Sequence, residues 1–124
     1  MNGGSGIVIQ NMWDVTVVNF EEARLLEAAT IESISLELYR LVEKMDRKKL
    51  VLDFTKVQYL ASAAVGMIMN VHKKSAAIKG LMIVVGLRKE LMKVFEIMGL
   101  VKVLKFAPNE AEAMKLLGYP GGNR

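Results

Sequence analysis

Ser62 lies at the predicted start of a helix, where a serine hydroxyl could cap the helix or accept a phosphate. It lies among alanines in the segment YLASAAVGMIMN, between a strand-like apolar run and the basic segment VHKK. A serine at a helix start can accept a hydrogen bond from a free backbone N–H of the first turn. A phosphate at the same place would meet free N–H donors and the positive end of the helix macrodipole. Both roles, helix cap and phosphate acceptor, are compatible with the sequence.

Asp53 and Thr55 form a second candidate group, an acid and a hydroxyl two residues apart. A catalytic triad needs a base and an orienting acid around a nucleophile, and the sequence suggests no such set, so we interpret the two residues as a strand end followed by a turn. His72 is the only histidine, and we place it with Lys73 and Lys74 on a solvated face. Cysteine is absent, which excludes a disulfide, a thiol nucleophile and cysteine-ligated zinc. We therefore expect no enzyme activity, metal or cofactor.

The composition is that of one globular domain. The chain has 124 residues, 52% of them hydrophobic and 24% charged, with 17 basic residues against 13 acidic ones. The resulting charge of +4 is scattered and aromatic residues are few, which argues against a nucleic-acid partner. No apolar run reaches the ~18 residues of a membrane span, and MNGGSG lacks the features of a secretory signal. We expect a soluble cytoplasmic protein with a flexible leader (1–11), a domain (12–118) and a flexible tail (119–124).

Strand-like and helix-like segments alternate along the chain. The predicted strands are WDVTVVNF and a short ARLL, followed by KLVLDF, LMIVVG and VKVLKF. Apolar stripes predict helices over 31–45, which includes Met45, and over 63–78, 88–98 and 110–117. Thr30 and Asn109 are the expected N-caps, and Gly80 the expected left-handed residue after the second helix. The alternation predicts a single α/β domain with about four helices and a mixed, mostly parallel sheet of four to six strands.

Nine residues are predicted to form the core because they occupy the apolar stripes and strand interiors: Ile34, Leu38, Leu41, Leu52, Ile68, Val71, Val84, Phe95 and Leu104.

The order of these elements, centred on LVLDFTKVQYLASAAVGMIM, resembles the STAS domain of bacterial anti-sigma factor antagonists from Trp13 to Leu117. In that family a strand ends in Asp-Leu-Ser or a similar tripeptide, and Asp-Ser-Ser-Gly-Leu-Gly then opens a helix. The corresponding segments here are DFT, which begins at Asp53, and ASAAVG, which begins at Ala61. By position, Ser62 falls on the family's phosphorylated serine. Alanine stands in place of the preceding aspartate, the second serine and the first glycine.

The resemblance implies a regulator that acts by partner switching. Unmodified, it would bind an anti-sigma factor, typically a serine kinase of the histidine-kinase-like ATPase fold, which then releases its sigma factor. Phosphorylation of Ser62 would weaken that docking, and a PP2C-type phosphatase would reverse it. The implied partner-binding residues are Thr55, Ala61, Ser62, Ala63, Val65, Gly66, Met67 and Met69.

Three of these partner-binding residues also have a structural interpretation. Gly66 suits close packing, while Met67 and Met69 suit either an adaptable binding surface or core filling. Two other functions remain open. One is a non-phosphorylated STAS scaffold in a larger signalling complex, which the missing aspartate favours. The other is a module that holds a nucleotide phosphate or another anion at the helix start.

Overall fold

The computed structural model describes residues 6–119, which form one five-stranded sheet with helices on both faces. The strand order is β1-β2-β4-β6-β7, in which β1 is antiparallel to β2 and the other neighbours are parallel. The predicted mixed, mostly parallel sheet is therefore confirmed. The strand bounds are Ile7–Met12 (β1), Val15–Phe20 (β2), Lys49–Asp53 (β4), Leu81–Val85 (β6) and Lys105–Ala107 (β7). Two further strands, β3 (Arg24–Leu25) and β5 (Tyr59–Leu60), form a small parallel pair of their own.

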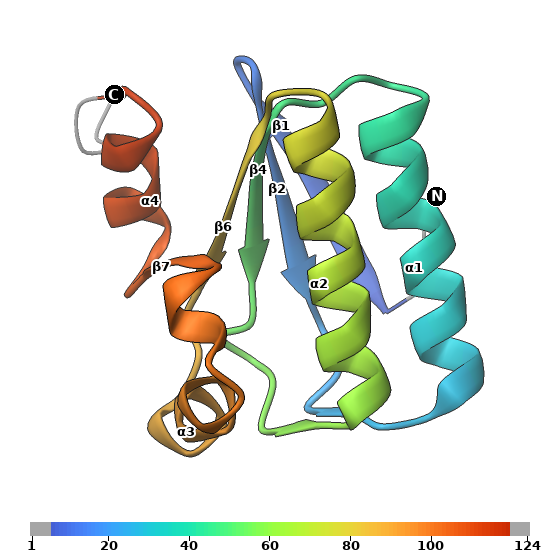
Figure 1. Ribbon diagram of the computed structural model, residues 1–124. Coiled ribbons are helices and arrows are strands. Elements are labelled where there is room, and N and C mark those ends of the chain that lie inside the picture. The colour runs from blue at the N-terminus through green and yellow to red at the C-terminus, as the bar shows by residue number, and fades with distance from the viewer. Residues whose placement is uncertain (1–5, 120–124) are drawn as a thin grey trace.

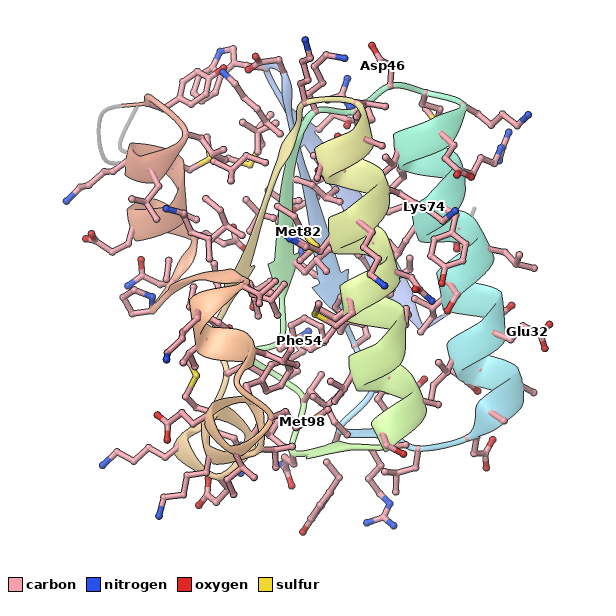
Figure 2. The ribbon with its side chains drawn as sticks, viewed as in Figure 1. Glu32, Asp46, Phe54, Lys74, Met82 and Met98 are labelled. Atoms are coloured by element: carbon pink, nitrogen blue, oxygen red, sulfur yellow. The ribbon has the colours of Figure 1, made fainter. Side chains whose placement is uncertain are left out.

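The helices cover the two faces of the sheet unequally (Figure 1). One face carries α1 (Ala28–Glu43) and α2 (Ser62–Ala77), which lie side by side, together with α3 (Lys89–Ile97) at its lower end. Within residues 6–119, the other face carries only the short α4 (Glu110–Leu116). Phe54 and Met82 point into the layer under α2 (Figure 2). The central strands are apolar on both faces because a core lies on either side of them.

The predicted core is confirmed: all nine predicted residues are buried. The start of the first helix differs from the prediction. It begins at Ala28 after Glu27, without a side-chain cap, so the prediction of Thr30 as N-cap was wrong. Alanine is the strongest helix former, and the pair Ala28–Ala29 extends the helix ahead of Thr30. The helix also ends two residues before Met45, which lies in the following turn with 53% of its side chain exposed.

The ends of the domain also differ from the expectation. Residues 7–11, expected in the leader, belong to β1 and pair with β2. Tyr119, expected in the tail, stacks on Trp13 with ring centroids 5.4 Å apart. The rest of the expected leader and tail, residues 1–5 and 120–124, lies outside the described residues. The predicted strand VKVLKF is shorter than expected, because Leu100–Lys102 forms a 3-10 turn (η1) and β7 begins at Lys105.

The predicted N-cap of the last helix is confirmed, and glycines follow the ends of two helices. The side chain of Asn109 accepts a hydrogen bond from the backbone N–H of Glu112 at 2.9 Å, and Gly99 and Gly118 have positive φ after α3 and α4. The prediction for Gly80 was wrong, because Lys79 takes the left-handed conformation with φ of 60°. A Cβ added at Gly80 would lie 2.6 Å from the carbonyl oxygen of Lys48, so the need for glycine there comes from close backbone approach.

Gly66 is the opposite case, because a Cβ added there would meet nothing within 4 Å. The packing role expected of this glycine is therefore wrong. Gly66 lies inside α2, where glycine is a weaker helix former than alanine.

Two alanine substitutions separate these glycines. We expect Gly80→Ala to lower the free energy of unfolding by about 1–3 kcal/mol, because backbone must move away from the new methyl group. Gly66→Ala should raise it by about 0.5–1 kcal/mol through helix propensity. Urea unfolding followed by circular dichroism measures both changes. A Gly66→Ala protein that is less stable than the wild type would show that the helix surface at this position is constrained by a contact that the structure does not contain.

Candidate functional site

Ser62 is the first residue of α2, and its side chain is exposed. The N-cap position falls one residue earlier, on Ala61, whose backbone is extended (φ −76°, ψ 157°), and no side-chain hydrogen bond caps the helix. The interpretation of Ser62 as N-cap was therefore wrong. The first N–H groups of a helix have no intrahelical acceptor, so the start of α2 presents free donors beside an unengaged hydroxyl.

A short backbone ladder fixes the position of this helix start. The segment before α2, β5, pairs with β3, and the Ala61 N–H donates to the carbonyl oxygen of Leu25 at 3.0 Å. The guanidinium of Arg24 lies 5.0 Å from the centre of the Tyr59 ring across the same pair. Because β3 leads directly into α1, the ladder holds the starts of α1 and α2 at one end of the molecule (Figure 1).

Two hollows flank the start of α2. The first, which we call the α1–α2 groove, has a volume of about 420 Å³ and is lined by residues of both helices, including Leu36, Ala63, Gly66 and Met67. The second, the α2–α3 cavity, has a volume of about 260 Å³ and is lined by Leu60, Ser62, Val65, Leu91, Val94, Phe95 and Met98. Ser62 itself lines only the second of these two hollows.

The predicted partner-binding residues divide between these hollows and the core. Ala63 and Gly66 are exposed along the α1–α2 groove, while Ser62 is exposed at the α2–α3 cavity. Met67 is 2% exposed and Val65 is 3% exposed, so both fill the core at the bottom of their hollows. The two remaining α2 positions, Ala61 and Met69, are half-buried against the same core.

Thr55 lies away from the other predicted residues. Its backbone N–H and its hydroxyl both donate to Oδ1 of Asp53, at 2.9 and 2.5 Å, which is the turn expected after the strand. Thr55 lines a separate hollow of about 540 Å³, formed by β1, β2 and the end of β4, whose lining includes no residue of α2. The structure therefore does not bring Thr55 and Ser62 to one site.

The basic residues after Ser62 are only partly solvated. Lys73 is exposed, but His72 is half-buried. Lys74 forms an ion pair with Glu43 of α1 at 2.7 Å, and its ammonium group lies 4.8 Å from the centre of the Tyr39 ring. Lys74 therefore joins α2 to α1, which the solvated-face interpretation did not include.

Comparison with known proteins decides the family. A sequence model of the STAS domain matches residues 8–113. The chain belongs to the STAS domain family.

Solved structures share the whole fold of this STAS domain. A candidate anti-sigma factor antagonist from Thermotoga maritima superposes with a TM-score of 0.83 at 16% identity, over 96% of this chain and 100% of the other. An anti-sigma-factor antagonist (STAS) domain protein from Planctomyces limnophilus gives 0.82 at 17% identity, over 91% and 98%. The Bacillus cell fate determinant SpoIIAA in its phosphorylated form gives 0.71 at 18% identity, over 90% and 98%. The TM-scores show a common fold, and at identities this low the comparison shows the fold alone.

The STAS domain also contains a pair of carboxyl groups that the sequence did not predict. Asp53 at the end of β4 faces Glu110, the first residue of α4. The hydrogen bond to Asp53, partial burial and the charge of Asp53 raise the pKa of Glu110 to about 7. Burial acts to raise the pKa of Asp53, but hydrogen bonds from Glu110 and Thr55 and the charge of Lys56 outweigh it, so this pKa is lowered.

A proton on Glu110 lets this carboxyl group donate to Asp53 between the start of α4 and the end of β4. Within residues 6–119, no three His, Cys, Asp or Glu side chains gather closely enough to bind a metal ion. No helix in this range has the length and apolar character needed to cross a membrane. The signal for the pair was weak in the sequence, because nothing in the pattern specifies that α4 folds back beside β4.

The proton on Glu110 makes stability depend on pH. Between pH 4.5, the ordinary pKa of this side chain, and about 7, the folded state binds more protons than the unfolded state, so stability should fall as the pH rises. Glu110→Gln keeps a hydrogen-bond donor for Asp53 without an ionisable proton, and should flatten this part of the profile. Urea unfolding at about pH 5, 6, 7 and 8 gives the free energy of unfolding at each pH, and therefore its slope across this window.

Glu112→Gln is the matched control for the pH profile, since Glu112 lies in the same helical turn and pairs with Lys115 instead. It should retain the wild-type slope. An unchanged slope in Glu110→Gln would mean that Glu110 does not carry the proton.

Proposed function

We propose that this STAS domain is an anti-sigma factor antagonist that acts by partner switching. In its unmodified form it binds an anti-sigma factor that is also a serine kinase of the histidine-kinase-like ATPase fold. The kinase phosphorylates Ser62, and a PP2C-type phosphatase removes the phosphate. The observation that carries this proposal is the exposed hydroxyl of Ser62, which lies at the first position of α2 without a capping role.

A phosphate on Ser62 is compatible with the fold. It adds about −1.5 to −2 charge at pH 7, and the helix N-terminus stabilises negative charge. The segment of α2 contains no aspartate or glutamate, so the helix itself does not repel the phosphate. The modification therefore changes the surface that a partner meets while the domain stays folded. Docking weakens because the partner would have to desolvate or approach a doubly charged group.

The domain is the substrate in this mechanism and supplies no catalytic group. It needs ATP, a kinase and a phosphatase as external components, and we place it in the cytoplasm with them. The rival function is a STAS scaffold that is not phosphorylated. It is supported by Ala61 and Ala63, which flank Ser62 and offer a kinase no polar side chain.

The proposal predicts a specific phosphate acceptor. The chain, incubated with ATP and each candidate kinase from its source genome in turn, should gain the mass of one phosphate with one of them. Ser62→Ala should abolish the gain, while Thr55→Val, which removes the other exposed hydroxyl of the predicted set, should retain it. Intact-mass spectrometry measures both results. If none of these kinases adds a phosphate, the result favours the scaffold function. If the mass gain is lost only in Thr55→Val, the phosphate acceptor is Thr55, in the hollow formed by β1, β2 and the end of β4.

Charge at Ser62 should control docking without changing stability. Because Ser62 does not cap α2, Ser62→Ala should change the free energy of unfolding by less than about 0.5 kcal/mol. Ser62→Asp should weaken binding to the phosphorylating kinase by about tenfold or more, and the neutral isostere Ser62→Asn should not. Titration calorimetry with the kinase and urea unfolding of each variant give the two quantities. Equal affinity of the Asp and Asn variants would contradict the switch.

A further inference from the structure

We propose that the α2–α3 cavity is an anchor site, which takes an apolar side chain from an acidic segment of a partner protein. The identity of that partner rests on the proposed function, whereas the recognition chemistry follows from the cavity and its surroundings.

The cavity has an apolar floor and an exposed rim. Phe95, Val65 and Leu91 form the floor and are 0%, 3% and 7% exposed. Val94 and Met98 form the rim and are 43% and 52% exposed. Met98 lies at the end of the molecule where α2 begins (Figure 2). An apolar cavity of about 150 Å³ can hold benzene, so 260 Å³ is enough for a branched or aromatic side chain.

Exposed apolar side chains continue from the rim along the chain. Ile97 is 86% exposed. Val101, inside η1, is 40% exposed, and Val103, directly after η1, is 48% exposed. Gly99, with φ of 74°, turns the chain between α3 and η1, so that Val101 and Val103 follow the rim residue Met98 after this turn. Apolar surface that gathers in one patch marks interaction sites, and the five exposed apolar residues from Val94 to Val103 lie within one ten-residue stretch of chain.

The chain segment that contributes the rim of the cavity is basic. Residues 88–105 contain five basic side chains, Arg88, Lys89, Lys93, Lys102 and Lys105, against two acidic ones, Glu90 and Glu96. The ion pairs found within residues 6–119 involve none of these seven residues. The cations are thus available to a partner, and the complementary partner surface is acidic.

Two other occupants fit less well. A second copy of this chain would bring an equally basic face, and like charges oppose that contact. An anionic lipid surface would satisfy the cations, but a flat bilayer surface does not fill a cavity between two helices. An acidic protein segment with an apolar side chain satisfies both the cavity and its charge.

The position of Ser62 links this cavity to the proposed switch. Ser62 lines the cavity, so a phosphate on it would stand at the entrance used by the apolar anchor. It would also repel the carboxylates of an acidic partner. The acidic partner chemistry therefore gives a physical reason for release on phosphorylation.

A titration of the ¹⁵N-labelled full chain tests this site without any kinase. The probe is the acidic apolar peptide Ac-EELLEELF-NH2. The controls are Ac-EESSEESS-NH2, which lacks apolar side chains, and Ac-KKLLKKLF-NH2, which reverses the charge. We expect the probe to shift the amide signals of Leu60, Val65 and Val94, and both controls to bind about tenfold more weakly or worse. The Ser62→Asp variant should bind the probe more weakly than the Ser62→Asn variant does.

Surface variants locate the binding. The double variant Val94→Ser and Met98→Ser should reduce probe affinity by about tenfold or more. Leu36→Ser, which removes a 64% exposed side chain from the α1–α2 groove, should not change it. Failure of the probe to bind, shifts confined to the α1–α2 groove, or equal binding of the basic peptide would each overturn the proposal.

Two further measurements test the other occupants. Co-sedimentation with phosphatidylglycerol–phosphatidylcholine vesicles that is lost in the double variant, without peptide binding, would assign the surface to lipid. Self-association in analytical ultracentrifugation that is lost in the same variant, again without peptide binding, would assign it to a second copy. Either result overturns the proposal. Peptide binding at the cavity without phosphorylation by any kinase would instead leave this inference standing and contradict the proposed function.

Discussion

The position of every residue around Ser62 depends on the burial of strand β4 between two cores. Leu50, Val51 and Leu52 are fully buried, and β4 pairs in parallel with both β2 and β6. After the strand, Phe54 stacks on Phe20 with ring centroids 4.3 Å apart. The chain then has only a short path to β5, where Gln58 and Tyr59 both donate to the carbonyl oxygen of Ala23. Because both ends of this path are fixed, the start of α2 is held in place although Ser62 itself is exposed.

The elements that were predicted from sequence are those whose own apolar pattern is strong. The strands β2, β4 and β6 read as continuous apolar runs because both of their faces are covered. The helices α2, α3 and α4 follow apolar stripes that end at or near glycine. β1 was missed because it is an edge strand, in which Val8, Gln10 and Asn11 are exposed, and its polar residues weaken the strand signal.

The candidate site was predictable only in part. The family resemblance located Ser62 within one residue of the helix start, but the local pattern could not distinguish the cap from the first helical position. That one-residue difference changes the physics, because a capping hydroxyl is engaged with the backbone, whereas the hydroxyl of a first-turn serine faces outward. The pairing of Asp53 with Glu110 and the position of α3 beside Ser62 are contacts between distant segments. Such contacts depend on how helices fold back on the sheet, which no local periodicity specifies.

Successive residues of a strand point to opposite faces of the sheet, and the end of β4 uses both. Val51 and Asp53 belong to the side covered by α4, while Leu52 and Phe54 belong to the side covered by α1, α2 and α3. The Asp53–Glu110 pair therefore lies in the layer opposite to the one that carries Ser62. A phosphate on Ser62 would add charge at the exposed start of α2, two residues before Ala64, the first buried residue of that helix. Because α2 and α4 cover opposite faces of the sheet, a change in the charge at Ser62 need not disturb the attachment of α4. This separation fits a domain whose surface is switched while its fold stays constant.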